Sequence, residues 1–72
     1  MMEKFLEFVA GIMDVDSSEL NENTSYGEGK WDSLMHMRLV METEDEYDIE
    51  IPIDEVPNIR TLNDLYRYTL NK

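Results

Sequence analysis

One long helical pattern over residues 33–47 limits what this chain can fold into more than any other feature. An α-helix turns by about 100° per residue, so residues three and four positions apart lie on the same face. One face of this stretch consists of Leu39, Val40, Thr43 and Tyr47, with His36 among them. A helix has to bury such a face against other elements, so we expect the rest of the chain to pack around it.

Two further segments repeat apolar residues at helical spacing. Residues 2–13 carry Phe5, Leu6, Phe8, Val9, Ile12 and Met13. Residues 61–70 carry Leu62, Leu65, Tyr66, Thr69 and Leu70. Thr61, with Asp64 three residues later, is similar to a capping box at the start of this last segment. Both segments are therefore predicted to be helices.

The remaining stretches predict shorter elements and no strand. Residues 53–56 fit one helical turn, and Pro57 is expected to stop it. Residues 14–30 form a long connection, in which 17–19 could hold a brief turn and Leu20 and Tyr26 are the expected anchors. We therefore predict an all-α fold: a small four-helix bundle of three main helices plus one short turn, with a long first loop. It is one domain over residues 1–72, with helices at about 2–13, 33–47, 53–56 and 61–70.

The chain is strongly acidic. Seventeen acidic residues against six basic ones give a formal net charge of −11 over 72 residues. Nucleic acid and anionic membrane surfaces are poor partners for such a domain, whereas basic patches on other proteins are good ones. A solvated acidic face that serves only solubility is the alternative. The acidic stretch that begins at Asp45 lacks the glycine and the terminal glutamate of an EF-hand, so no calcium site is predicted.

Several features point to a cytoplasmic domain, and we expect it to be a monomer. Glu3 and Glu7 interrupt the first apolar stretch, which argues against a signal peptide, and no run is long enough to span a bilayer. The sequence has no cysteine, so neither disulfides nor thiolate metal sites can brace the fold. A small soluble domain is therefore expected.

The helix over residues 33–47 has a second apolar face, formed by Leu34, Met37 and Met41. Two interpretations remain open. A neighbouring helix could cover this face, or the face could be a recognition surface. Methionine suits the second interpretation, because its flexible side chain repacks easily against different partners.

Asp32 and Ser33 mark the start of this helix. Asp32 is a good N-cap, which places Ser33 at the first helical position, where negative charge is favoured. Ser33 could also be an ordinary polar residue at a helix start. His36 lies one turn away, but a serine–histidine hydrolase would need a third orienting group and an oxyanion hole, and the sequence indicates neither. A partly buried histidine is the simpler interpretation.

Taken together, these stretches resemble the acyl carrier protein family over nearly the whole chain. The resemblance is carried by Asp32-Ser33-Leu34, Leu39-Val40-Met41, Glu46-Tyr47, Glu50-Ile51-Pro52 and Thr61-Leu62. It implies a carrier that is not itself an enzyme. Ser33 would be esterified by 4′-phosphopantetheine from coenzyme A through a separate phosphopantetheinyl transferase, and the thiol of that arm would hold acyl groups as thioesters.

The resemblance also implies partners and recognition residues. The partners would be an acyl ligase, a ketosynthase or an acyltransferase with a basic docking surface, in fatty acid, polyketide or related secondary metabolism. By position, the recognition residues are Asp32, Leu34, Met37, Arg38, Met41, Glu44 and Asp45, with Ile51 and Val56 near the arm. Two alternatives stay open: a carrier of aminoacyl groups, such as a D-alanyl or peptidyl carrier, and an acidic interaction module without the prosthetic group.

The chain departs from the family pattern at several positions. Arg38 stands where glutamate is usual, Met35 and His36 replace a more acidic or small pair, and Thr43 replaces an aliphatic residue. Trp31 occupies a position usually held by leucine or a small residue. These departures suggest a specialised stand-alone carrier rather than the housekeeping carrier of fatty acid synthesis, with partners that present an acid opposite Arg38.

Overall fold

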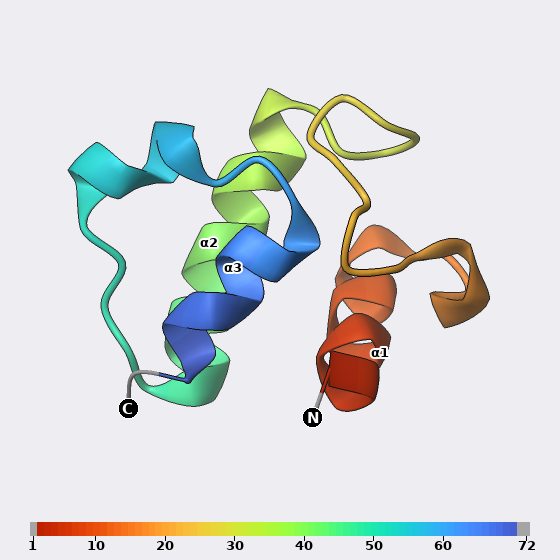
Figure 1. The fold of residues 1–72 in the computed structure, drawn as a ribbon, viewed down its shortest axis with the longest axis horizontal. Coiled ribbons are helices and arrows are strands. Elements are labelled where there is room, and N and C mark those ends of the chain that lie inside the picture. Colours follow the sequence, from red (N-terminus) through yellow and green to blue (C-terminus); the bar gives the residue numbers. More distant parts are fainter. Residues whose placement is uncertain (1, 71–72) are drawn as a thin grey trace.

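A computed structural model describes residues 2–70 (Figure 1). Met1, Asn71 and Lys72, the ends of the expected 1–72 domain, lie outside the described residues. The elements in order are α1 (Met2–Met13), the 3₁₀ helix η1 (Ser17–Glu19), α2 (Ser33–Tyr47), the 3₁₀ helix η2 (Ile53–Asn58) and α3 (Leu62–Thr69). Within this part of the chain there is no strand, only an isolated bridge between Ser25 and Thr61. The predicted all-α fold is confirmed.

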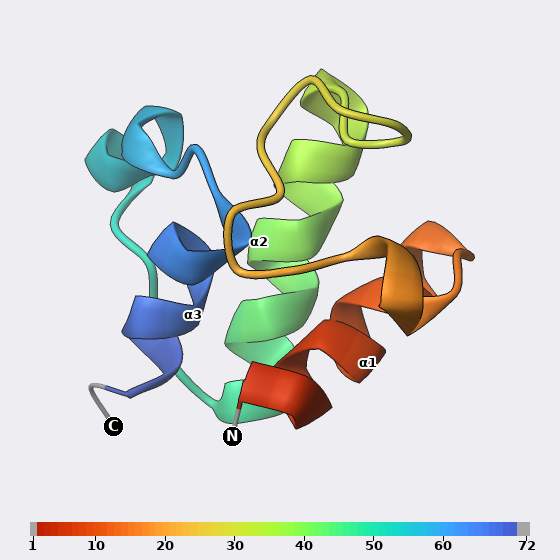
Figure 2. The same ribbon diagram turned by 45° about the vertical axis from the view of Figure 1, so that its right-hand side comes forward.

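Helix α2 is the central element of the bundle. It contacts both α1 and α3, and Figure 2 shows it standing between them. The long loop and η2 lie at the end of the bundle where α2 begins, in both views (Figures 1 and 2). The start of α2 is therefore surrounded by the two least regular segments of the chain.

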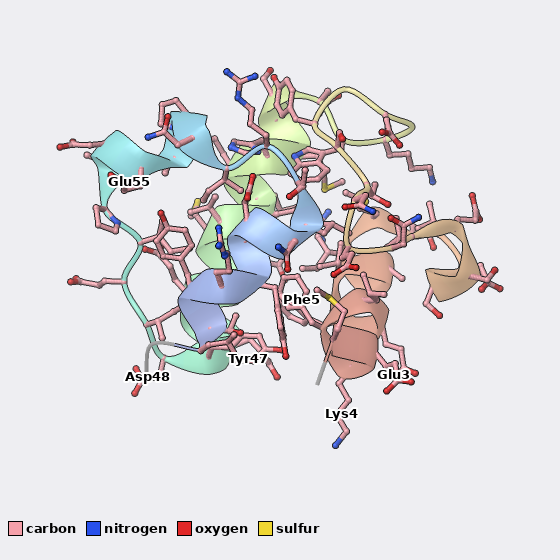
Figure 3. All side chains as sticks on the ribbon, viewed as in Figure 1. Glu3, Lys4, Phe5, Tyr47, Asp48 and Glu55 are labelled. Carbon is pink, nitrogen blue, oxygen red and sulfur yellow. The ribbon has the colours of Figure 1, made fainter. Side chains whose placement is uncertain are left out.

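The core is formed where the apolar faces of the three helices meet. Phe5 of α1 is fully buried, and its ring lies 5.3 Å from that of Tyr66 and 6.2 Å from that of Tyr47. In Figure 3, Phe5 points into the bundle toward Tyr47, whereas Glu3 and Lys4 point away from it. The remaining buried apolar side chains are Val9, Ala10, Ile12, Met13, Trp31, Leu39, Val40, Ile51, Val56, Ile59, Leu62 and Leu65.

The long loop is anchored by backbone hydrogen bonds to the start of α3. Leu62 donates its N–H to the carbonyl of Thr24 at 3.0 Å, and the N–H of Tyr26 donates to the carbonyl of Arg60 at 2.8 Å. The ring of Tyr26 is 43% exposed, but it contacts the buried rings of Trp31 and His36 at centroid distances of 6.2 and 5.1 Å, so Tyr26 does anchor the loop. Leu20, the other expected anchor, is partly buried against the core. Thr24 is the buried side chain of residues 14–30, and Trp31, which follows directly, is also buried.

Two element ends differ from the expectation. The 3₁₀ turn does not stop at Pro57, because the N–H of Ile59 bonds to the carbonyl of Val56 at 3.2 Å and so continues the turn without needing a proline N–H. Leu70 is the C-cap of α3 rather than part of its apolar face, and it is 64% exposed. The expected capping box of Thr61 and Asp64 is present. Of the helices described, none is long and apolar enough to cross a membrane.

Thr43 is the weak point of the core. Its side chain is fully buried in α2, and its hydroxyl has no hydrogen-bond partner within the described residues. Thr69 of α3 is also buried, but its hydroxyl donates to the carbonyl of Tyr66 at 2.6 Å. The two threonines therefore differ in whether burial of the hydroxyl is compensated.

We predict that Thr43→Val raises the free energy of unfolding by about 1 kcal/mol, because it replaces an unpaired buried hydroxyl by a methyl group of the same shape. Thr69→Val is the matched control and should lower the stability, since it removes a hydrogen bond that is made. Urea unfolding of both variants measures this difference. Equal changes in the two variants would contradict the interpretation.

Candidate functional site

The candidate site is the first turn of α2, and Asp32 sets its geometry. Asp32 has the extended backbone of an N-cap, with φ −107° and ψ −172°. Its Oδ1 accepts a hydrogen bond from the N–H of Met35 at 2.9 Å, and its carbonyl accepts from the N–H of His36 at 2.8 Å. The helix therefore starts cleanly at Ser33.

Ser33 is exposed at the first position of α2. N–H groups of a first helical turn lack partners within the helix, and together with the helix dipole they favour a negatively charged group placed there. The surroundings of Ser33 therefore fit a phosphate ester on its hydroxyl. The first turn carries no acidic residue after Asp32 that would repel such a group. Asp32 itself is the nearest negative charge along the chain, and it is occupied as the cap.

An apolar groove lies on the outer face of α2 beside Ser33. Its volume is about 520 Å³. Its apolar lining includes Leu34, which is 81% exposed, Met37 and Met41, which is 62% exposed. Its charged lining consists of Lys30, Asp32, Arg38 and Glu42. The second apolar face of α2 is thus open to solvent, and the interpretation that a neighbouring helix covers it is wrong.

The structure divides the candidate recognition residues into two groups. Those exposed to solvent are Asp32, Leu34, Met37, Arg38, Met41 and Asp45. Glu44 is partly buried, and its Oε2 accepts the N–H of Ile51 at 2.7 Å, so it holds the chain after α2. Ile51 and Val56 are only 6% and 8% exposed. Core packing therefore leaves these two little apolar area to offer a partner, and their place near the arm stays a prediction.

Arg38 makes an ion pair on its own helix. Its Nε lies 2.8 Å from Oε2 of Glu42, one turn along α2. Both side chains are well exposed, so the pair contributes little to stability. Its effect is to hold the guanidinium beside the groove, where its remaining N–H groups can meet an acceptor on another molecule.

The inner side of the same turn is closed by aromatic side chains. Trp31 is 1% exposed, and its Nε1–H donates to Nδ1 of His36 at 2.9 Å. Nε2 of His36 lies 2.9 Å from the carbonyl oxygen of Val56 in η2. Both ring nitrogens of His36 are thus engaged by Trp31 and Val56, which leaves neither to activate Ser33 as a hydrolase would require. The sequence pattern did not predict that His36 contacts Trp31 and Val56, because the three residues belong to different structural elements.

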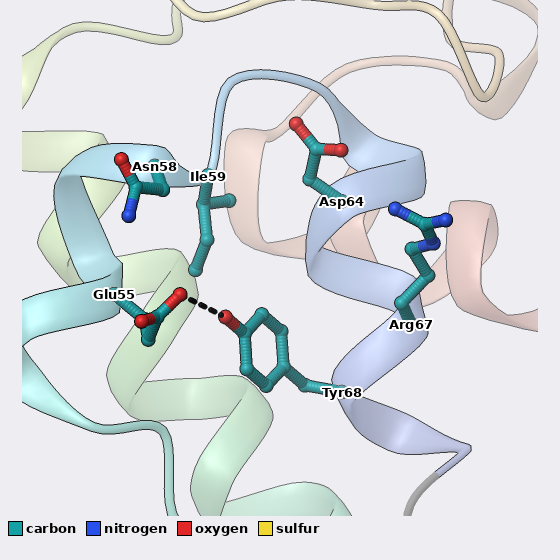
Figure 4. A pocket seen from close by; sticks show the side chains of 6 residues that line it. All are labelled: Glu55, Asn58, Ile59, Asp64, Arg67 and Tyr68. Carbon is teal, nitrogen blue, oxygen red and sulfur yellow. Dashed lines mark hydrogen bonds between the residues drawn. The ribbon is translucent and has the colours of Figure 1, made fainter.

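A second hollow, of about 400 Å³, lies between η2 and α3 (Figure 4). Across it, the hydroxyl of Tyr68 donates to Oε1 of Glu55 at 3.3 Å. Partial burial raises the pKa of Tyr68, and the neighbouring carboxylate of Glu55 raises it further. The hydrogen bond thus forms with a neutral phenol, and it ties η2 to α3. Among the described residues, no cluster of three or more histidine or acidic side chains could hold a metal ion.

Comparison with known proteins agrees with this geometry. Residues 3–69 match the family described as "Phosphopantetheine attachment site". The chain is 33% identical to a protein named "Acyl carrier protein" from Caulobacter vibrioides (strain NA1000 / CB15N), over 100% of this chain and 94% of that one. It is 37% identical to one of the same name from Rickettsia massiliae (strain Mtu5), over 92% of this chain and 78% of that one.

We predict that Asp32→Ala lowers the free energy of unfolding by about 1 kcal/mol, whereas Asp32→Asn changes it by only a few tenths, because asparagine is as good an N-cap as aspartate. Thermal or urea unfolding of the two variants measures the difference. Equal losses would mean that the charge of Asp32, and not its cap, stabilises the start of α2.

Proposed function

Because the chain belongs to the acyl carrier protein family, we propose that Ser33 is the residue to which its 4′-phosphopantetheine is attached. The protein is a carrier and not an enzyme, and the group is bound covalently. The thiol at the end of that group holds acyl cargo as a thioester. The observation that carries the choice of Ser33 is its exposed position at the first turn of α2, directly after the Asp32 cap.

The residues around Ser33 have separate tasks in this proposal. Asp32 fixes where the helix begins, so the hydroxyl of Ser33 stands outside the hydrogen-bonded part of α2. The N–H groups of the first turn and the helix dipole favour the phosphodiester formed when the serine oxygen takes phosphopantetheine from coenzyme A. A separate phosphopantetheinyl transferase with magnesium would catalyse that transfer.

We further propose that the outer groove of α2 is where partner enzymes dock. Leu34, Met37 and Met41 offer exposed apolar area next to the arm. The net charge of −11 would steer the domain toward basic surfaces on those enzymes. Asp32, the N-cap of α2, and Asp45 within α2 are exposed and supply part of that charge. The composition suits a monomeric carrier of the cytoplasm.

Arg38 suggests a specialised carrier. Glu42 holds the guanidinium of Arg38 beside the groove. The guanidinium adds a positive charge to the face of an otherwise acidic domain. We propose that the cognate loading enzyme presents an acidic residue opposite Arg38. The cargo is then an acyl group of fatty acid, polyketide or related secondary metabolism, and an aminoacyl group is the second candidate because it would use the same arm.

The attachment site is tested by incubating the protein with coenzyme A, magnesium and a broad-specificity phosphopantetheinyl transferase, followed by intact mass measurement. We expect the chain to gain one phosphopantetheine group, and Ser33→Ala to gain none, because it lacks the accepting oxygen. Ser25→Ala is the matched control, since Ser25 lies in the long loop, and it should gain the group normally. An unmodified chain would refute the carrier role, and a modified Ser33→Ala variant would refute the choice of Ser33.

Arg38→Glu tests the docking proposal. We expect it to lower kcat/KM for loading by the cognate ligase or synthase about tenfold, because it places a negative charge opposite the expected acid. Arg67→Glu is the control, since Arg67 is exposed on α3 and changes the net charge equally. The proposed role of Arg38 in docking would be contradicted if Arg38→Glu left the rate of loading unchanged. It would also be contradicted if both variants slowed loading equally.

A further inference from the structure

The strongest unexplained feature is the chain of hydrogen bonds on the inner side of the Ser33 turn. It runs from the indole of Trp31 through the imidazole of His36 to the carbonyl of Val56, with 2.9 Å at each step. All three residues are buried. We call this chain, Trp31–His36–Val56, the clasp. It joins the start of α2 to η2, two segments that lie 20 residues apart at their point of contact.

The clasp has one consistent arrangement of hydrogens. An indole N–H can only donate, so Nδ1 of His36 has to be the acceptor of the Trp31 bond. A neutral imidazole then carries its proton on Nε2, which donates to the carbonyl of Val56. Each buried polar atom of the two rings is therefore paired. Breaking the clasp would leave buried polar atoms without partners, which is strongly disfavoured.

The rings of the clasp also fill the space between the two segments. Trp31 and His36 are stacked, with ring centroids 5.8 Å apart and an interplanar angle of 21°. The ring of Tyr26 covers His36 edge-on at 5.1 Å. Outside the clasp lies a hollow of about 300 Å³, lined by Tyr26, His36, Pro57, Ile59 and Arg60. His36 thus stands between this hollow and the buried core.

The 3₁₀ helix η2 depends on the clasp for its position. It has no side-chain cap at its start, and Val56 is its buried residue. The Val56 carbonyl that accepts from His36 also accepts the N–H of Ile59 at 3.2 Å. The clasp therefore holds η2 at the point where it enters the core. The hydrogen bond from Tyr68 to Glu55 holds η2 from the α3 side, and neither residue belongs to the clasp.

We propose that the clasp keeps the bundle closed to the cargo of the Ser33 arm, so that an acyl group stays outside the core; this rests on the proposed attachment at Ser33. A chain entering between α2 and η2 has to displace His36 from Val56 or Trp31 from His36. A long aliphatic chain left outside would expose apolar surface to water unless it occupied the outer groove of Leu34, Met37 and Met41, where it would compete with the partners that we propose dock there. The clasp therefore favours a short or polar acyl group as cargo.

The test uses the full chain loaded by a phosphopantetheinyl transferase from either acetyl-coenzyme A or octanoyl-coenzyme A, and confirmed by intact mass. Methyl NMR spectra then report the buried side chains of Leu39 and Leu62, and the single tryptophan reports its indole N–H. We expect the acetyl and octanoyl forms to give the same signals for these groups. Octanoyl-specific changes at Leu39, Leu62 and the indole would overturn the proposal.

Two variants open the clasp, and one serves as control. Trp31→Phe removes the indole N–H and keeps an aromatic ring, and His36→Ala removes both bonds. In each we expect octanoyl-specific changes in the core methyl signals, and hydrogen exchange of the Ile59 N–H about tenfold faster. Tyr68→Phe loosens η2 from α3 without opening the clasp, and its core signals should not depend on the cargo.

The outcomes separate the clasp from the proposed function. A chain that gains no mass refutes the attachment at Ser33, whereas the clasp is judged only on chains that have gained it. If the Trp31→Phe and His36→Ala variants fold and still exclude the octanoyl group from the core, the proposed role of the clasp is refuted. If both variants fail to fold, the comparison of acetyl and octanoyl forms of the unaltered chain decides.

Discussion

The burial of Trp31 directly before the start of α2 is the interaction on which the rest of the structure depends. The indole is the largest fully buried side chain, and the next two residues, Asp32 and Ser33, are exposed. The chain can turn from core to surface this sharply because the Asp32 cap starts a helix at once. His36, one turn later, returns to the core and bonds to Trp31. The serine is thus presented outward from a turn that is fixed from inside.

This arrangement gives α2 two faces with separate tasks. The inner face, with Leu39 and Val40, forms the wall of the core, and α1 and α3 pack against it. The outer face, with Leu34 and Met41, contributes almost nothing to the core. Residues on the outer face can therefore change with little cost in stability, and a positive residue such as Arg38 can stand there in an acidic domain.

The sequence predicted what depends on local pattern, and it missed what depends on contacts between elements. The helical spacing of apolar residues placed α1 and α2, and the Thr61–Asp64 capping box placed the start of α3, because these signals lie within a few residues of each other. The burial of Ile51 and the bond between His36 and Val56 depend on how distant segments pack. A tryptophan and a histidine on either side of a helix cap were the visible signal of that contact.

The small size of the domain makes the two buried side-chain hydrogen bonds at this turn important for its stability. A chain of 72 residues has a free energy of unfolding of only about 4–11 kcal/mol by the usual proportion to length. Two buried hydrogen bonds are therefore a considerable share of what the fold can supply. They hold η2, a segment without a cap of its own, against the helix that carries Ser33. The two bonds therefore stabilise the same turn to which we propose that the prosthetic arm is attached.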